Sequence, residues 1–179
     1  MAKTVFFVIA SQGFRDEELF EPLELLKSEG YETKILSQIK GTCQGSKGGS
    51  VQSDAALDQV VLDEEVCALI VIGGPGSPEL MKVSALGTLL LQAKERGLVI
   101  GAICLGPMVV SSFDVISGKK ATVFPTQESL TLLEEKGVEY VKEDVVVDGL
   151  LVTANGPHAA SAFGHTLIDA IADSLAKEL

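Results

Sequence analysis

The sequence of 179 residues predicts an α/β fold with a mainly parallel sheet. Short apolar runs alternate along the chain with segments whose apolar residues recur at helical spacing, which is the pattern of strands alternating with helices. Several runs, such as 68–72, are apolar without interruption, as is typical of parallel strands buried on both faces. Because no internal repeat or interdomain linker interrupts this pattern, we expect a single domain over residues 1–179.

The first part of the chain contains two predicted strands and one helix. The run at 4–10 is rich in β-branched and aromatic residues, and 31–37 is the second strand. Between them, 16–28 is predicted to be a helix, because its apolar residues recur at helical spacing, acids occupy its first turn and Gly30 can end it. The Gly- and Ser-rich segment 41–54 predicts an irregular excursion or a small hairpin.

The alternation continues to the end of the chain. A strand at 68–72 stops at the turn GGPGSPE, a helix follows at 85–96, and a strand at 98–103 leads into a short helix at 105–112. The remaining expected elements are a strand at 120–124, a helix at 127–136, late strands at 138–141 and 145–154 with a tight turn at Asp148–Gly149, and a terminal helix at 158–178.

The composition excludes several classes of function. A net charge of −11 argues against binding to nucleic acid or to anionic membrane surfaces. The three cysteines are widely spaced and the two histidines lie seven residues apart, so we expect no disulfide framework, no metal site and no cofactor. The N-terminal apolar run is too short for a secretory signal, and no run reaches the length of a membrane helix. We therefore expect a cytoplasmic protein.

A cysteine interrupts the apolar pattern in the stretch VIGAICLGPMV. Cys104 stands between the strand 98–103 and the helix 105–112. A sharp strand-to-helix turn exposes the side chain of its turn residue, as in a nucleophile elbow. The N-terminus of the helix is expected to lower the pKa of a thiol placed there. The alternative is that Cys104 is a small hydrophobic residue in the core.

Two other segments contain candidate site residues. The glycines after the strand 68–72 allow backbone amides to approach a ligand, and the N–H groups of Gly74 and Leu105 are candidates for an oxyanion hole. A plain Gly/Pro turn is the alternative. Glu18 lies in an acidic helical turn, where exposure to solvent is the default for any one acid. Pro22 within the same helix nevertheless indicates an unusual local environment.

Four motifs spread over nearly the whole chain give it a resemblance to a known family: EELFEP, ALIVIGG, GAICLGP and TANGP. In this combination the chain resembles the ThiJ/PfpI superfamily, which includes the parkinsonism-associated deglycase and PfpI-type intracellular proteases. The resemblance implies a flavodoxin-like α/β/α sandwich with Cys104 at a nucleophile elbow. It also implies that Glu18 is protonated and hydrogen-bonds the sulfur, and that Gly74 and Leu105 are the backbone donors beside it. Such a contact would stabilise the thiolate and, after oxidation, a sulfinate.

The chain departs from the family's pattern at both usual histidine positions. PfpI-type members have His directly after the cysteine, where this chain has Leu105. Deglycase-type members have His before a proline on the next strand, where this chain has Phe124. A Cys–His protease dyad at these positions is therefore excluded. We expect a homo-oligomer, a dimer or larger, whose contacts do not follow from the family.

His158 is the substitute general base that the sequence offers. It follows the Gly-Pro pair of TANGP, a loop that borders the cysteine pocket in this family, and the start of the last helix favours a neutral imidazole. The alternative is a surface histidine that caps the helix. We expect His165 to be structural and to lie on the buried face of that helix. Cys67 is expected in the core, and Cys43 is expected to be exposed and oxidisable.

Three functions remain open. In the first, the Cys104 thiolate attacks a small reactive carbonyl such as methylglyoxal, Glu18 or His158 moves the proton, and water releases lactate, as in a glyoxalase III or a deglycase. The second is a redox-sensing protein of the oxidative-stress response in which Cys104 is oxidised to a sulfinate. The third, an intracellular peptidase, is the weakest because Leu105 replaces the required histidine. A glutamine amidotransferase is disfavoured because the chain has no His-Pro segment. We favour the enzyme acting on carbonyls.

Overall fold

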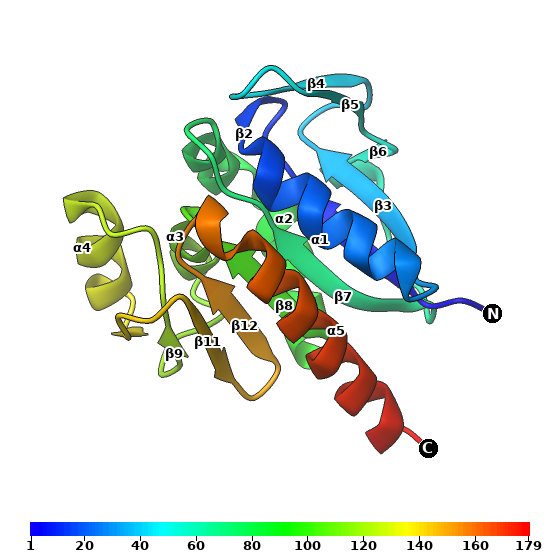
Figure 1. Cartoon of the computed structure of the whole chain (residues 1–179). Helices are drawn as coiled ribbons and strands as arrows, with labels where there is room; N and C mark the ends of the chain where they lie inside the picture. The colour runs from blue at the N-terminus through cyan, green and yellow to red at the C-terminus, as the bar shows by residue number, and fades with distance from the viewer.

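A computed structural model describes residues 1–179 and shows a seven-stranded sheet between helices (Figure 1). The strands of this sheet are Thr4–Val8 (β1), Glu32–Ser37 (β3), Ala55–Ala56 (β6), Val66–Val71 (β7), Val99–Ile103 (β8), Val145–Asp148 (β11) and Leu151–Ala154 (β12). Their order is β11-β12-β8-β7-β1-β3-β6, and only the edge pair of β11 and β12 is antiparallel. The expected α/β sandwich with a mainly parallel sheet is confirmed.

Helices cover both faces of the sheet. They are Asp16–Ser28 (α1), Ser84–Glu95 (α2), Gly106–Ser112 (α3), Gln127–Glu135 (α4) and Ala160–Lys177 (α5), with short 3₁₀ helices at Leu57–Gln59 (η1), Ser77–Lys82 (η2) and Pro157–Ala159 (η3). In Figure 1, α1 and α5 lie side by side on the near face, and α2 and α3 lie behind the sheet. None of the helices is long and apolar enough to cross a membrane.

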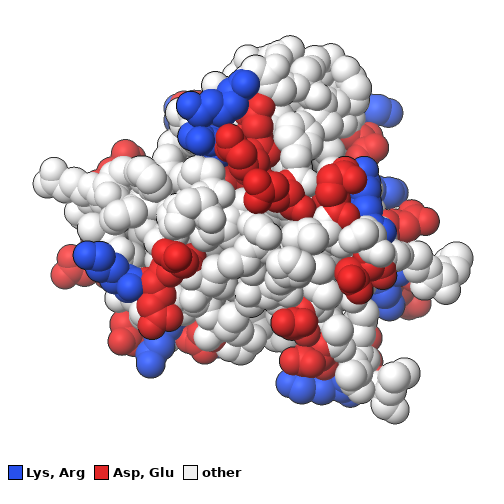
Figure 2. Space-filling view, viewed as in Figure 1, with Lys and Arg blue, Asp and Glu red and all other residues white.

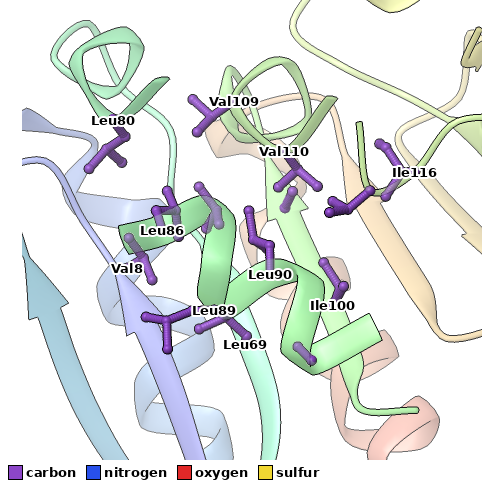
Figure 3. Close-up of a cluster of buried hydrophobic side chains, with 14 of the residues drawn as sticks. Val8, Leu69, Leu80, Leu86, Leu89, Leu90, Ile100, Val109, Val110 and Ile116 are labelled. Carbon is purple, nitrogen blue, oxygen red and sulfur yellow. The ribbon is translucent and has the colours of Figure 1, made fainter. Parts of the chain in front are cut away.

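The uninterrupted apolar strands contribute side chains to two separate hydrophobic cores, one on each face of the sheet, because successive side chains point to opposite faces. In β1, Val5 and Phe7 pack under α1 and α5, whereas Phe6 and Val8 pack under α2 and α3. Figure 3 shows the second core, in which leucines of α2 and valines of α3 meet residues of β1, β7 and β8. This burial on both faces explains why these strands read as continuous apolar runs.

The contact between α1 and α5 accommodates Pro22. Gly164 of α5 faces it, and a Cβ at Gly164 would lie 3.1 Å from the Pro22 Cα and 2.7 Å from a methyl carbon of Leu25. The two helices therefore approach more closely than a larger residue would allow. Because Pro22 has no N–H, the carbonyl of Glu18 loses its helical donor at this point.

The segment 41–54 forms the small hairpin that was one of the two expected alternatives. Its strands, Thr42–Gly45 (β4) and Ser50–Gln52 (β5), are antiparallel and continue into a three-stranded sheet with Gln12–Phe14 (β2). The short strand β2, which the sequence pattern did not predict, is explained by its pairing with β4. The hairpin tip is held by Asp16, whose carboxylate accepts the N–H groups of Lys47 at 3.0 Å and Gly49 at 2.7 Å.

Some late elements differ from the expected ones. Only Lys120–Ala121 (β9) of the expected strand 120–124 is paired, and its partner is Glu139–Tyr140 (β10). The terminal helix begins at Ala160, because Pro157–Ala159 form a 3₁₀ turn first. His165 is exposed, so its expected place on the buried face of α5 is wrong. That face is formed by other residues, which are Ala160, Phe163, Gly164, Leu167 and Ile171.

Candidate active site

Cys104 occupies the turn between the end of β8 and the start of α3. Its φ is +63°, in the left-handed region that residues other than glycine rarely adopt. Both of its backbone groups are held: the N–H donates to the carbonyl of Ala154 at 2.8 Å, and the carbonyl accepts from the N–H of Phe124 at 2.8 Å. A constrained strand–turn–helix junction of this kind is the geometry of a nucleophile elbow.

Two backbone N–H groups face the sulfur of Cys104. They belong to Gly74, in the loop after β7, and to Leu105, the N-cap of α3, and both lower the pKa of the thiol. Gly74 has a φ of +109°, and a Cβ there would lie 2.4 Å from the backbone N of Arg15. Glycine is therefore required at this position, both for the backbone angle and for space. These are the two donors that the sequence pattern singled out.

Glu18 is the buried acid of the site. It lies in the first turn of α1 and its side chain has no exposed surface, in contrast to Asp16, Glu17 and Glu21 on the same helix. Its Oε1 accepts the N–H of Gly73 at 3.0 Å, and its Oε2 is buried without a well-formed hydrogen bond. The Cys104 sulfur is close enough to act on this carboxyl as a hydrogen-bond partner.

Glu18 and Cys104 shift each other's protonation. Burial raises the pKa of Glu18 to about 7, against the hydrogen bonds from Cys104 and Gly73, which lower it. Burial, followed by the negative charge of Glu18, raises the pKa of Cys104 to about 12. Two acids in one buried site titrate as a pair, so the first proton leaves near neutral pH and the second only at strongly alkaline pH.

The pKa of Cys104 is therefore raised overall, so the expectation of a lowered value is wrong: burial of the thiol, and after it the charge of Glu18, outweighs the groups that lower the pKa. Helix α3 has only seven residues, and its dipole is opposed by the burial of the thiol and by the adjacent carboxylate. The N–H groups of Gly74 and Leu105 do lower the pKa of Cys104, but they are smaller influences.

Arg15 is a residue of this site that the sequence analysis missed. Its backbone N–H donates to the carbonyl of Gly73 at 3.1 Å, and its guanidinium pairs with Glu17 while the side chain keeps 29% of its surface exposed. The hydrogen bond that Arg15 donates to Glu17, more than any other contact, raises the pKa of Arg15, and the charges of Glu18 and Cys104 raise it as well. The signal was available: Arg15 is one of two arginines in the chain and directly precedes the acidic turn.

His158 and Phe124 lie on the other side of the cysteine turn. Phe124 is fixed beside Cys104 by its backbone hydrogen bond and is 44% exposed. The His158 side chain is exposed, and its Nε2 lies 3.3 Å from Oδ1 of Asp144, which Asn155 also contacts at 3.3 Å. A Cβ at Gly156 would contact both rings, at 3.4 Å from His158 Nδ1 and 3.6 Å from a carbon of Phe124. No hydrogen bond joins His158 to the sulfur.

The other two cysteines lie in the core on the α1 and α5 side. Cys67 is buried as expected, and burial raises its pKa to about 11. Cys43 was expected to be exposed, and this is wrong: it is fully buried, because the β4–β5 hairpin folds onto the strand β2 and turns its side chain inward. Cys104 is the most accessible of the three thiols, with 8% of its surface exposed.

An apolar cavity lies at a distance from this chemistry. It measures about 300 Å³ and opens where β8 and β12 begin, between residues such as Leu98, Ile116 and Leu151. Cys104 follows the opposite end of β8, and the cavity is lined by no cysteine and no carboxylate; its only charged residues are Lys94 and Lys119. We therefore place the candidate site at Cys104, where the reactive groups converge.

These features define the class of protein. It is an α/β sandwich in which a cysteine stands at the carboxyl end of a central parallel strand, where open α/β sheets place their sites. A model of the DJ-1/PfpI family matches residues 3–170, and the chain belongs to this family.

Individual relatives agree with this assignment. The chain is 38% identical to an uncharacterized protein of Methanocaldococcus jannaschii, over 93% of this chain and 82% of the relative. It is 35% identical to a deglycase of Pyrococcus horikoshii, over 86% and 90% of the two chains. A glutathione-independent glyoxalase of Caenorhabditis elegans is 28% identical, over 94% and 89%. The crystal structure of a ThiJ/PfpI domain protein from Brachyspira murdochii superposes with a TM-score of 0.90 at 26% identity, covering 96% of this chain and 98% of that one.

Proposed function

We propose that the protein is a cysteine-dependent enzyme acting on small reactive carbonyl compounds, with Cys104 as the nucleophile. The observation that carries this proposal is the fully buried Glu18 carboxyl beside the Cys104 sulfur. A buried acid whose pKa is raised to about 7, placed against a nucleophile, is typical of sites that transfer protons. Glu18 is then the group that gives and takes the proton near neutral pH.

For a 2-oxoaldehyde the reaction balances without an external oxidant. The thiolate adds to the aldehyde carbon, a C–S bond forms, and the resulting oxyanion takes a proton to give a hemithioacetal. A base removes the proton from that carbon, and a proton returns to the neighbouring carbon. The first carbon is thereby oxidised to a thioester while the second is reduced to an alcohol. Water breaks the C–S bond and releases a 2-hydroxy acid and the thiol.

We assign a role to each neighbour of the sulfur. The N–H groups of Gly74 and Leu105 are the donors that would stabilise negative charge on the sulfur or on the oxyanion. With only 8% of Cys104 exposed, the site favours a substrate whose reacting carbon is unhindered, such as an aldehyde. The names of two relatives, a deglycase and a glutathione-independent glyoxalase, support this class of substrate.

His158 is the second candidate for a base in this proposal. Its exposed ring is oriented by Asp144, in the manner of a histidine held by a carboxylate. Phe124 and His158 both flank Gly156, so His158 approaches the site from the side on which deglycase-type relatives are expected to carry their histidine. Its role would be to move protons for a bound substrate at the mouth of the site.

The alternative function is redox sensing. In that case a peroxide oxidises the Cys104 thiolate to a sulfenate and a second peroxide oxidises it to a sulfinate, each giving one oxygen to sulfur and leaving as water or hydroxide. The observation that favours it is the buried Oε2 of Glu18, which lacks a well-formed hydrogen bond. A protonated Oε2 would have a sulfinate oxygen to donate to. An intracellular peptidase is not supported, since Leu105 offers no base.

Further parts of the proposal concern organisation. We propose one domain over residues 1–179, a homo-oligomeric assembly and a cytoplasmic location. The continuous central sheet and the family match over 3–170 support the first of these. Size-exclusion chromatography with light scattering tests the second, and cell fractionation tests the third.

The deciding experiment compares two readouts in one set of variants. Methylglyoxal consumption with lactate release measures the enzyme, and mass spectrometry of Cys104 after peroxide treatment measures oxidation. We expect Cys104→Ser to abolish both and His158→Ala to reduce only turnover, by roughly a hundredfold. His165→Ala, an exposed histidine on α5, is the matched control. Full turnover in His158→Ala would refute its role as base, and no turnover in the wild type would leave the redox function.

A further inference from the structure

Four consecutive residues at the start of α1 have four different environments. Glu18 is buried against Cys104, and Asp16 holds the hairpin tip through the N–H groups of Lys47 and Gly49. Glu17 extends to solvent and pairs with the guanidinium of Arg15. Arg15 itself is the N-cap residue of α1, and its backbone is bonded to Gly73. The side chains of Arg15 and Glu17 form hydrogen bonds only with each other.

The Arg15 backbone is bonded to the loop that surrounds the sulfur. The carbonyl of Gly73 binds the Arg15 N–H, and the N–H of Gly73 binds Glu18, so one glycine joins Arg15 to the catalytic acid. The next residue, Gly74, packs against the Arg15 backbone and donates to the sulfur. The positive charge of Arg15 acts on both Glu18 and Cys104.

The positive charge of Arg15 lies next to an acidic stretch of the surface. The chain has 25 acidic and 14 basic residues, and in Figure 2 acidic side chains gather along α1, with basic ones at the end of α1 next to β2. A protein with this balance repels small anions. An arginine beside the site would offset that effect once its guanidinium is released from Glu17, and its planar fork matches a carboxylate.

We propose that Arg15 is the anion-recognition residue of the Cys104 site and that the preferred substrates are 2-oxoaldehydes, or their adducts, that carry a carboxylate. This inference rests on the proposed function for the nature of the substrate. In the resting protein the guanidinium of Arg15 is paired with the carboxylate of Glu17. A substrate carboxylate takes its place, so that Arg15 exchanges one carboxylate partner for another while the aldehyde carbon reaches the sulfur.

The test uses two alkylating agents of nearly the same shape. Iodoacetate carries a carboxylate and iodoacetamide is neutral, and both form the same C–S bond with the Cys104 thiolate while iodide leaves. The ratio of their rates cancels any change in thiol reactivity. We expect Arg15→Gln to lower the iodoacetate-to-iodoacetamide ratio about fivefold. Arg96→Gln removes the other arginine, which binds the carbonyl of Leu62, and should leave the ratio unchanged.

A second pair of variants tests the same idea in the opposite direction. Glu17→Gln releases the guanidinium and should raise the ratio, whereas Glu21→Gln, which removes an exposed acid from the same helix, should not. Arg15→Lys should retain part of the preference. An unchanged ratio in Arg15→Gln overturns the proposal. If that variant does not fold, an unchanged ratio in Glu17→Gln overturns it.

The outcome is independent of the proposed enzyme. If the wild type turns over no carbonyl compound but Arg15→Gln lowers the ratio, Arg15 is still the anion-recognition residue and only the substrate class is withdrawn. If turnover is found, the matched substrates are methylglyoxal and a 2-oxoaldehyde with a terminal carboxylate. Arg15→Gln should then raise KM for the charged substrate severalfold more than KM for methylglyoxal, and an equal change for both substrates would overturn the recognition of the carboxylate.

Discussion

Glu18 and Cys104 lie against the same glycine. A Cβ added at Gly73 would lie 2.8 Å from Oε1 of Glu18 and 2.7 Å from the Cβ of Cys104. Gly73 therefore does more than form a turn after β7: its missing side chain leaves the space in which the acid and the thiol meet, and its N–H holds the acid at 3.0 Å.

Gly73→Ala should accordingly separate the pair. The added methyl group lacks room, and overpacking of this kind costs about 1–3 kcal/mol in the free energy of unfolding. We expect a lower melting temperature and a slower alkylation of Cys104. The matched control is Gly156→Ala, where the backbone is extended and the nearest atom would lie at an ordinary 3.4 Å. Equal effects of the two substitutions would contradict the packing argument.

Much of the fold and of the sulfur's surroundings followed from local sequence patterns. The continuous apolar runs predicted buried parallel strands, and helix α1 begins and ends at the expected residues. Cys104, Gly74 and Leu105 converge because each follows a strand of one parallel sheet, so their sequence positions sufficed.

The remaining features depend on contacts that no local pattern encodes. Glu18 is one of four acids within six residues, and only the packing of α1 against the loop after β7 distinguishes the buried one. The burial of Cys43 depends on how a glycine-rich hairpin folds back onto β2. The sign of the shift in the pKa of Cys104 was missed for the same reason, since a helix terminus is visible in the sequence and the degree of burial is not.

The stability of the protein should depend on pH through Glu18. Its pKa is raised from 4.5 to about 7 in the folded state, so the folded state prefers the protonated carboxyl. That contribution, about 3 kcal/mol at most, is present in full below the unfolded value of about 4.5 and is lost as pH rises through about 7. Glu18→Gln cannot ionise and lacks this dependence.

Urea denaturation at about pH 5 and about pH 8 measures this effect. Relative to Glu18→Gln, the wild type should lose about 2 kcal/mol of its free energy of unfolding between the two pH values. Glu21→Gln, an exposed acid of the same helix, serves as the control and should follow the wild type. Parallel pH profiles for the wild type and Glu18→Gln would show that Glu18 does not titrate in this range.

Asp16 should control the order of the β4–β5 hairpin. Its carboxylate is the acceptor for the N–H groups of both Lys47 and Gly49, so Asp16→Ala leaves two donors without a partner, at a cost of about 1–3 kcal/mol. We expect the amides of residues 47 and 49 to exchange with solvent much faster. Glu24→Ala, on the exposed face of α1, should leave their exchange unchanged. Slow exchange in Asp16→Ala would mean that strand pairing alone orders the hairpin.

The alkylation of Cys104 should follow the titration of the pair rather than that of an isolated thiol. The pair loses its first proton near the Glu18 pKa of about 7 and its second near about 12. Between these values it holds one proton, which either the carboxyl or the sulfur carries, and the fraction on the carboxyl leaves a thiolate that Gly74 and Leu105 stabilise. The rate of reaction with iodoacetamide should therefore rise through about pH 7 and reach a plateau.

In Glu18→Gln no carboxyl is left to exchange the proton, so the inflection near pH 7 should disappear and the rate should rise only as the thiol itself ionises. A wild-type profile with one inflection at the ordinary thiol pKa of about 8.5, unchanged by Glu18→Gln, would mean that the two groups are not coupled and that Glu18 is not the proton donor of this site.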